Sequence, residues 1–206
     1  MGPDPGPRPR ATIRHTLFYS FKRDMNRSSS DNSRIRGAGP EAAVAIIRAA
    51  GEDPEFLLLR RASNPLDPWS GHFALPGGRM ESGDKDLLET CIRETFEECA
   101  IRLESAHLIK ALPIAIAGIH MGRPVEVAPF LFEMPEKPAL TLSAVEIAEY
   151  HWLPQSYLRN PANRHKAALS LGHPDMQFPC IRVGAGGAIW GFTYGVLENL
   201  WESALP

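Results

Sequence analysis

A glycine turn followed by an acidic helix constrains this chain more than any other feature of its sequence. The turn is Gly77-Gly78, and Glu94, Glu97 and Glu98 follow it at relative positions i, i+3 and i+4. A helix has about 3.6 residues per turn, so these three carboxylates share one face and repel one another. No lysine stands four residues further on to relieve the repulsion. Such a face is costly unless divalent cations bind it, and carboxylate oxygens suit Mg²⁺ or Mn²⁺.

Length and charge narrow the classes of protein to which the chain belongs. With 206 residues it is long enough for one well-buried domain and short for two. The net charge of −2 gives no general case for nucleic-acid or membrane binding. Residues 1–40, however, hold eight Lys and Arg against three Asp, and are rich in Pro, Gly and Ser. We predict a flexible basic extension over 1–40 and a folded domain over 41–206, with nucleic-acid binding by the extension as a minor alternative.

The three cysteines do not make a disulfide framework. Cys91 and Cys99 would lie on one helix, about 12 Å apart by helical rise, which is too far to bridge. Cys180 then has no evident partner, so we expect three reduced thiols and a cytoplasmic location. No apolar run approaches the roughly 20 residues that span a bilayer, and the first residues lack the apolar core of a secretory signal.

Short apolar runs between turn residues indicate a mixture of strands and helices. We expect strands over 42–47, 56–59, 72–75, 108–119 (one or two, broken at Pro113), 125–132, 150–153 and 188–190. Pro129 predicts an edge or a bulge in its strand, because proline donates no hydrogen bond to a sheet. Helices are expected over 143–149 and from about 192 to 203, and 159–175 is expected to be irregular. Without regular βαβ alternation, the order predicts an α+β fold, an α/β/α sandwich around a mixed sheet.

The acidic helix should begin near Asp84 or Asp86, either of which can cap it. Its apolar residues recur at helical spacing, which predicts that this stripe is buried and that the glutamates face the other way. The predicted stripe consists of Leu88, Ile92, Phe96 and Cys99.

The pattern Gly78-x5-Asp84-x8-Arg93-Glu94-x2-Glu97-Glu98-x2-Ile101 resembles the Nudix box, the signature of hydrolases that act on nucleoside diphosphates linked to another group. Asp84 and the gap of eight residues are similar to the coenzyme A diphosphatase branch. So are the segments 57–61, 71–78 and 189–193, and the resemblance covers about residues 42–203. The chain departs from that branch at Asp67, where an Arg is usual, at Leu75 for Phe, and at Ala100 for Gly.

The resemblance implies roles for residues around the turn. Glu94, Glu97 and Glu98 would bind the metal, with the Gly77 carbonyl completing the coordination. Arg93 would hold the loop by pairing with a carboxylate such as Asp84 or Glu81. The general base would be Glu98 or a carboxylate from another loop, for which Glu146 is the first candidate and Glu126 the second.

Candidate substrate contacts lie on either side of the turn. Arg60 and Arg61 match the fork geometry of phosphate, but strand alternation lets only one of them point into the site. Gly78 would let the backbone approach the phosphate. His72 is a candidate phosphate contact, with a loop-anchoring hydrogen bond as the alternative. Trp69 and Trp190 would stack on a base or pack in the core.

Taken together, these features predict a metal-dependent pyrophosphohydrolase that uses Mg²⁺ or Mn²⁺ to split the phosphoanhydride of a nucleoside diphosphate derivative. By resemblance, coenzyme A and its derivatives head the substrates. The competing hypothesis is a catalytically inactive Nudix-like module that binds or senses a nucleotide. A small molecule is the expected partner, and the sequence leaves open whether the protein is a monomer or a homodimer.

Overall fold

The computed structural model describes residues 39–64, 69–118, 124–169, 176–184 and 186–202. The predicted basic extension falls outside these ranges except for its last two residues, so its flexibility stays a prediction. Asp67, one of the departures from the coenzyme A diphosphatase branch, also lies outside the described residues.

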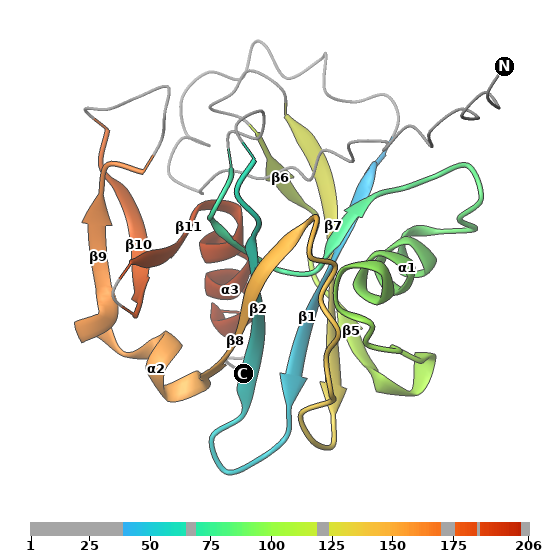
Figure 1. Cartoon of the computed structure of the whole chain (residues 1–206), viewed down its shortest axis with the longest axis horizontal. Coiled ribbons are helices and arrows are strands. Elements are labelled where there is room, and N and C mark those ends of the chain that lie inside the picture. The colour runs from blue at the N-terminus through green and yellow to red at the C-terminus, as the bar shows by residue number, and fades with distance from the viewer. Residues whose placement is uncertain (1–38, 65–68, 119–123, 170–175, 185, 203–206) are drawn as a thin grey trace, which may run out of the picture.

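Within the described residues, two sheets and three α-helices make up the fold (Figure 1). The larger, mixed sheet contains β1 (Ala42–Ala49), β2 (Glu55–Arg61), β3 (Phe73–Ala74), β4 (Gly77–Arg79), β5 (Leu108–Ala111), β6 (Ala115–Ala117), β7 (Val125–Met134) and β8 (Ile147–Pro154). The smaller sheet contains β9 (Arg164–Ala167), β10 (Phe178–Val183) and β11 (Gly187–Trp190). The helices are α1 (Leu87–Cys99), α2 (Gln155–Arg159) and α3 (Gly191–Glu202), with 3₁₀ turns at Ser105–His107 and Pro161–Asn163.

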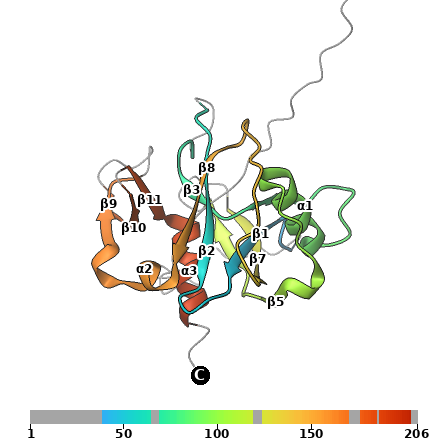
Figure 2. The ribbon, with the colours of Figure 1, turned by 60° about the horizontal axis from the view of Figure 1, so that its bottom comes forward.

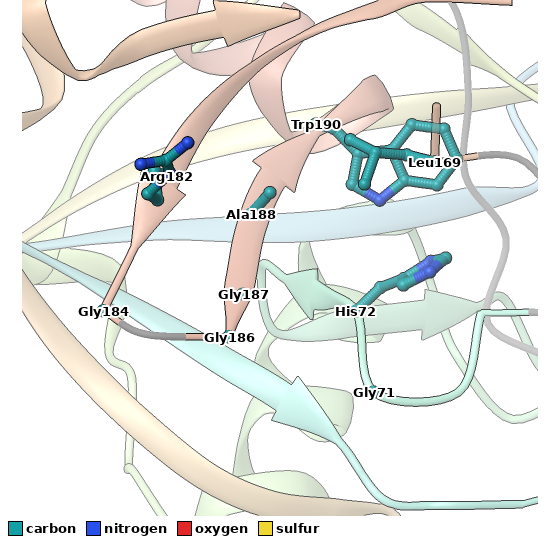
Figure 3. Close-up of a pocket in the computed structure, with 9 residues that line it drawn as sticks. All are labelled: Gly71, His72, Leu169, Arg182, Gly184, Gly186, Gly187, Ala188 and Trp190. Atoms are coloured by element: carbon teal, nitrogen blue, oxygen red, sulfur yellow. The ribbon is translucent and has the colours of Figure 1, made fainter. Parts of the chain in front are cut away.

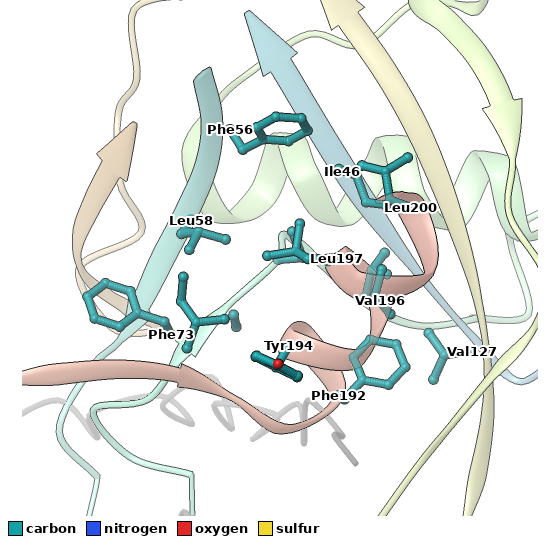
Figure 4. Packing of buried hydrophobic residues seen from close by; sticks show 14 of the residues in the cluster. Ile46, Phe56, Leu58, Phe73, Val127, Phe192, Tyr194, Val196, Leu197 and Leu200 are labelled. Carbon is teal, nitrogen blue, oxygen red and sulfur yellow. The ribbon is translucent and has the colours of Figure 1, made fainter. Parts of the chain in front are cut away.

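The mixed sheet lies between α1 on one face and α3 on the other (Figures 1 and 2). Alternation along β1 sends Val44 and Ile46 into the apolar cluster of α3, and Ala45 and Ile47 into that of α1. On the α3 side, side chains of β1 and β2 meet Leu197 and its neighbours (Figure 4). The predicted α/β/α sandwich around a mixed sheet is confirmed.

The first two strands separate soon after their hairpin, and the glycine turn fills the gap between them. β1 pairs with β2 only at Arg48↔Phe56 and Ala49↔Glu55. Further along, β1 pairs with β4, and the Ala45 amide donates to the Pro76 carbonyl at 2.8 Å. The two glycines predicted to form a turn therefore belong to a short strand that is anchored in the centre of the sheet.

Pro129 lies in the interior of the sheet, so the predicted edge position is wrong. Its strand, β7, runs parallel to β1 on one side and antiparallel to β5 and β6 on the other. The Leu112 amide donates to the Pro129 carbonyl at 2.9 Å, in the interval between β5 and β6. Because N–H and C=O of one strand residue point the same way, the missing donor of Pro129 faces this break in the neighbouring strand.

Both ends of α1 have specific caps. Asp86 caps the start, and its side chain accepts the Glu89 amide at 2.8 Å. Ala100 ends the helix in the left-handed conformation, with φ of 58°, and donates its amide to the Phe96 carbonyl. The glycine that is usual here in the branch that the sequence resembles would adopt that conformation without strain.

The predicted apolar stripe of α1 is confirmed at Cys99, which is buried, and at Leu88 and Ile92, which pack partly buried against the same cluster, but it is wrong at Phe96. Phe96 is 41% exposed and carries the Arg102 guanidinium 4.5 Å above its ring. The prediction that the glutamates face away from the core is also wrong, because Glu94 and Glu98 are buried beside Cys91 and Cys99. Helical spacing shows which residues share a face but not which face packs on the sheet, and here the face with Glu94 and Glu98 packs on β1 and β4.

The structure also corrects two segments of the predicted order. Residues 143–146 form a turn, not a helix, in which the Glu146 and Ile147 amides donate to the Ser143 carbonyl, and β8 begins at Ile147. The segment expected to be irregular contains β9, and β10 was not expected at all. The last strand and terminal helix are confirmed, as are three free cysteines. Among the described helices, none has the length and apolarity to cross a membrane.

We predict that Ala100→Gly raises the free energy of unfolding by about 0.5–1 kcal/mol. A left-handed conformation costs an alanine roughly 1–2 kcal/mol, and this relief outweighs the greater freedom of glycine in the unfolded chain. Urea denaturation measures the change. The matched control is Ala148→Gly on β8: this alanine has no positive φ, so the substitution should cost about 0.5–1 kcal/mol instead. Destabilisation by both variants to the same extent would contradict the prediction.

Candidate active site

Two of the three helix glutamates are buried against the glycine strand. Glu94 and Glu98 are 6% and 5% exposed, whereas the Glu97 side chain is 36% exposed. The Gly77 amide donates to Glu98 at 3.0 Å. A Cβ added to Gly78 would lie 2.5 Å from the carboxyl carbon of Glu94 and would push this carboxylate away from the strand. The structure thus brings the acidic face and the glycine strand into direct contact.

Arg93 joins the loop after the glycine strand to α1. Its Nε and Nη2 donate to the two carboxylate oxygens of Asp84, both at 2.8 Å, and Nη2 also donates to the Arg79 carbonyl. Nη1 donates to Glu94 at 2.8 Å and lies 3.5 Å from Glu97. This bidentate pair holds the pKa of Asp84 well below, and that of Arg93 above, its usual range. The Arg93–Asp84 pair expected from the sequence is therefore present.

Burial raises the pKa of Glu98 to about 8, and the charges of Glu94 and Glu146 add to this effect. The Gly77 amide and the Arg61 guanidinium act in the opposite direction. Thus the side chains around Glu98 carry more negative than positive charge, an arrangement that disfavours ionisation unless a cation is present.

Glu146 reaches this cluster because its turn is fastened to both neighbouring elements. The Ser143 amide donates to the Glu98 carbonyl at the end of α1, at 2.9 Å. The Ala62 amide donates to the carbonyl of Glu146 itself, at 2.8 Å. A carboxylate about fifty residues from the helix in sequence is thereby held near Glu98. Glu126, the other candidate base, lies on β7 opposite Ile116, and because Val125 and Val127 face the α3 cluster, strand alternation places it on the α1 side of the sheet.

Only one of the two adjacent arginines on β2 faces the acidic cluster. Arg60 donates to Glu149 at 2.8 Å and to the Gly71 carbonyl at 3.0 Å, so it braces the loop before β3. Arg61 is the arginine whose charge acts on Glu98. The prediction that only one of them can point into the site agrees with this arrangement.

His72 lies beside Trp190 rather than against the carboxylates, with ring centroids 5.0 Å apart and the rings nearly perpendicular. Both residues line a small cavity together with Arg61 and Trp69. They also line a second, larger cavity of about 290 Å³ (Figure 3). The sequence missed this larger cavity because its wall contains β10, whose alternating Phe178–Val183 pattern was the signal that could have identified it.

The donor chemistry of the acidic face fits Mg²⁺ or Mn²⁺, because every candidate ligand is a hard oxygen and the cluster carries excess negative charge. Within the described residues, however, no group of three or more His, Cys, Asp and Glu side chains is already arranged to hold a metal ion. Two features of the helix bear on this: Arg93 donates a hydrogen bond to one oxygen of Glu94, and the Glu97 side chain is partly exposed to solvent. A cation would have to compete with Arg93 for Glu94 and draw Glu97 inward.

Comparisons with known proteins agree with this site. The family model of the NUDIX domain matches residues 39–171. The uncharacterized Nudix hydrolase NudL of Yersinia enterocolitica is 32% identical over 175 residues, which cover 77% of this chain and 78% of NudL. An uncharacterized protein of Schizosaccharomyces pombe is 37% identical over 141 residues, covering 58% of this chain and 43% of that protein's length.

A solved MutT/nudix family protein from Enterococcus faecalis shares the fold, with a TM-score of 0.54 at 15% identity over 79% of this chain and 60% of that one. Fold, glycine strand and acidic helix together define a hydrolase of phosphoanhydrides. The chain belongs to the Nudix family.

We predict that the metal-free protein loses stability as the pH rises, by roughly 3 kcal/mol between about pH 5.5 and 8, through Glu98. Folded Glu98 keeps its proton up to about pH 8, whereas the unfolded chain releases it near pH 4.5. Folding therefore takes up a proton between these values, and the free energy of unfolding falls with rising pH. Glu98→Gln cannot ionise and should remove this slope. Urea denaturation of both proteins in EDTA measures it, and parallel curves would refute the assignment.

Proposed function

We propose that the protein is a divalent-metal-dependent pyrophosphohydrolase that splits the phosphoanhydride of a nucleoside diphosphate linked to another group. One observation carries the proposal: two buried carboxylates, Glu94 and Glu98, lie against the two glycines of β4, where an added Cβ would meet the β1 backbone at Gly77 and the Glu94 carboxylate at Gly78. Burying two like charges side by side is unfavourable unless a cation or a proton compensates them.

In this proposal Glu94, Glu97 and Glu98 hold Mg²⁺ or Mn²⁺, with the Gly77 carbonyl as a further ligand. The bound metal would neutralise the diphosphate and lower the pKa of water. Arg93 and Asp84 would keep the loop in place, and Arg61 would neutralise substrate phosphate from the opposite side.

The reaction needs a base that takes a proton from water as the water oxygen bonds to phosphorus and the bridging P–O bond breaks. Glu98 and Glu146 are the two candidates. Glu146 is supported by the two backbone hydrogen bonds that fix its turn beside Glu98. Glu98 would serve if it is ionised when metal is bound. Either residue would return the proton to solvent after the products leave.

Coenzyme A and its derivatives are the first substrates to test. The support is the resemblance of the Nudix box, with its Asp84 and gap of eight residues, to the coenzyme A diphosphatase branch. ADP-ribose, dinucleotides and nucleoside triphosphates are the alternatives within the same reaction type. We also propose a cytoplasmic location, for which the support is that all three cysteines are free thiols.

We predict that Glu97→Gln lowers kcat with Mg²⁺ by about 10²-fold or more, because it removes one metal-binding charge while leaving the side-chain volume unchanged. The assay is hydrolysis of the four substrate classes above, with products identified by mass. Glu89→Gln, a half-exposed position in the first turn of the same helix, is the matched control and should retain activity. A wild-type protein that hydrolyses nothing in the panel, but binds a nucleotide, would favour the inactive sensor.

A second prediction separates the two glycines. Gly78→Ala should leave the fold intact but lower kcat/KM about 10²-fold, because its Cβ would displace the end of the Glu94 side chain. Gly77→Ala should unfold the protein, because its Cβ would lie 2.2 Å from the Ala43 carbonyl oxygen. Thermal denaturation and activity are measured together. Gly83→Ala, whose Cβ would meet nothing within 4 Å, is the control, and equal losses in Gly78→Ala and Gly83→Ala would contradict the prediction.

A further inference from the structure

The cavity of about 290 Å³ has a wall built by the β10–β11 hairpin. The register pairs Arg182 with Ala188 and Ile181 with Ile189. Because strand side chains alternate, Arg182, Ala188 and Trp190 share one face of the hairpin, while Ile181 and Ile189 are buried in the α3 core on the other. Figure 3 shows these three side chains, with His72 across the cavity.

The lining combines an aromatic surface with a single strong cation. Trp190 and Leu169 supply apolar surface, and the described residues that line the cavity include no acidic side chain. Arg182 is exposed, and among the described residues no carboxylate forms an ion pair with it. The Tyr157 hydroxyl donates to the Arg182 carbonyl at 2.8 Å, which fixes the backbone from which the guanidinium extends.

The cavity shares two lining residues with the small cavity beside Arg61. His72 and Trp190 line it on one side and line the small cavity beside Arg61 on the other. Arg61 in turn acts on the charge of Glu98. Trp190 is therefore common to the proposed cavity and to the small cavity that Arg61 lines.

We propose that this cavity binds a phosphorylated nucleoside, with the base against Trp190 and the phosphate group at Arg182. The inference rests on the proposed function only in taking the substrate to be a nucleotide derivative. Stacking of a base on an aromatic side chain is tolerant of base identity, and the planar guanidinium binds phosphate through two parallel hydrogen bonds. The volume lies near the lower limit of ligand pockets, about 300 Å³, so it suits a single nucleoside.

The test is calorimetric titration of the full chain in EDTA with adenosine 5′-monophosphate and, separately, with adenosine. Without metal, binding cannot take place through cations on the acidic helix. Arg182→Met should lower the affinity for adenosine 5′-monophosphate at least tenfold and change the affinity for adenosine by less than threefold. Arg182→Lys keeps the charge but loses the two parallel hydrogen bonds, so it should weaken the binding of adenosine 5′-monophosphate measurably but less than Arg182→Met does. Arg102→Met, at an exposed arginine beyond α1, should leave the affinity for both ligands unchanged. Ala188→Leu, which narrows the cavity, should lower the affinity for both ligands at least fivefold.

The inference is overturned if the wild-type protein binds neither ligand. It is also overturned if Arg182→Met lowers the affinity for adenosine as much as the affinity for adenosine 5′-monophosphate. Thermal denaturation of each variant shows that lost binding is not lost folding. Hydrolysis assays separate this inference from the proposed function. An active enzyme whose nucleotide binding ignores Arg182 refutes the cavity alone, whereas Arg182-dependent binding without hydrolysis refutes the reaction alone.

Discussion

The hydrogen bond from the Gly77 amide to the Glu98 carboxylate links the centre of the sheet to the acidic helix. It forms because β1 and β2 separate after two paired residues, and the segment ending in Gly77-Gly78 occupies the gap. The buried carboxyl of Glu98 then gains a donor but remains beside Glu94. Arg93 compensates Glu94 on the other side while binding Asp84. The fold thus holds two acidic groups in place before any substrate arrives.

Much of this site could be predicted from sequence because its determinants are local. The spacing of Glu94, Glu97 and Glu98 fixes their common helix face, whatever the helix packs against. The Asp86 cap depends only on the side chain and the amide three residues on. The clamp between Arg93 and Asp84 follows from the charges at the two ends of a short segment. Local geometry is enough for each of these.

The errors occurred where tertiary packing decided between local alternatives. Hydrophobicity predicted that Phe96 is buried and the glutamates exposed. In the structure Phe96 is exposed, with the Arg102 guanidinium over its ring, and Glu94 is buried. Apolar residues are usually buried and charged residues exposed, and a functional site that buries charge departs from this rule. Pro129 is tolerated in the interior because the neighbouring strand is broken opposite it, and this break could not be aligned with it from sequence.

Adjacent residues of one strand connect the two halves of the site. Arg60 and Arg61 have different partners, and the pairing register of β2 with β8 shifts between them. Arg61 adds positive charge beside Glu98, whereas Arg60 binds the Gly71 carbonyl and Glu149 and lies over the Phe73 ring. Phe73 in turn packs so closely on Gly187 that no Cβ could fit there. Through these contacts the end of β2 acts on both the acidic cluster and the β11 wall of the cavity, so a shift of this strand would move both together.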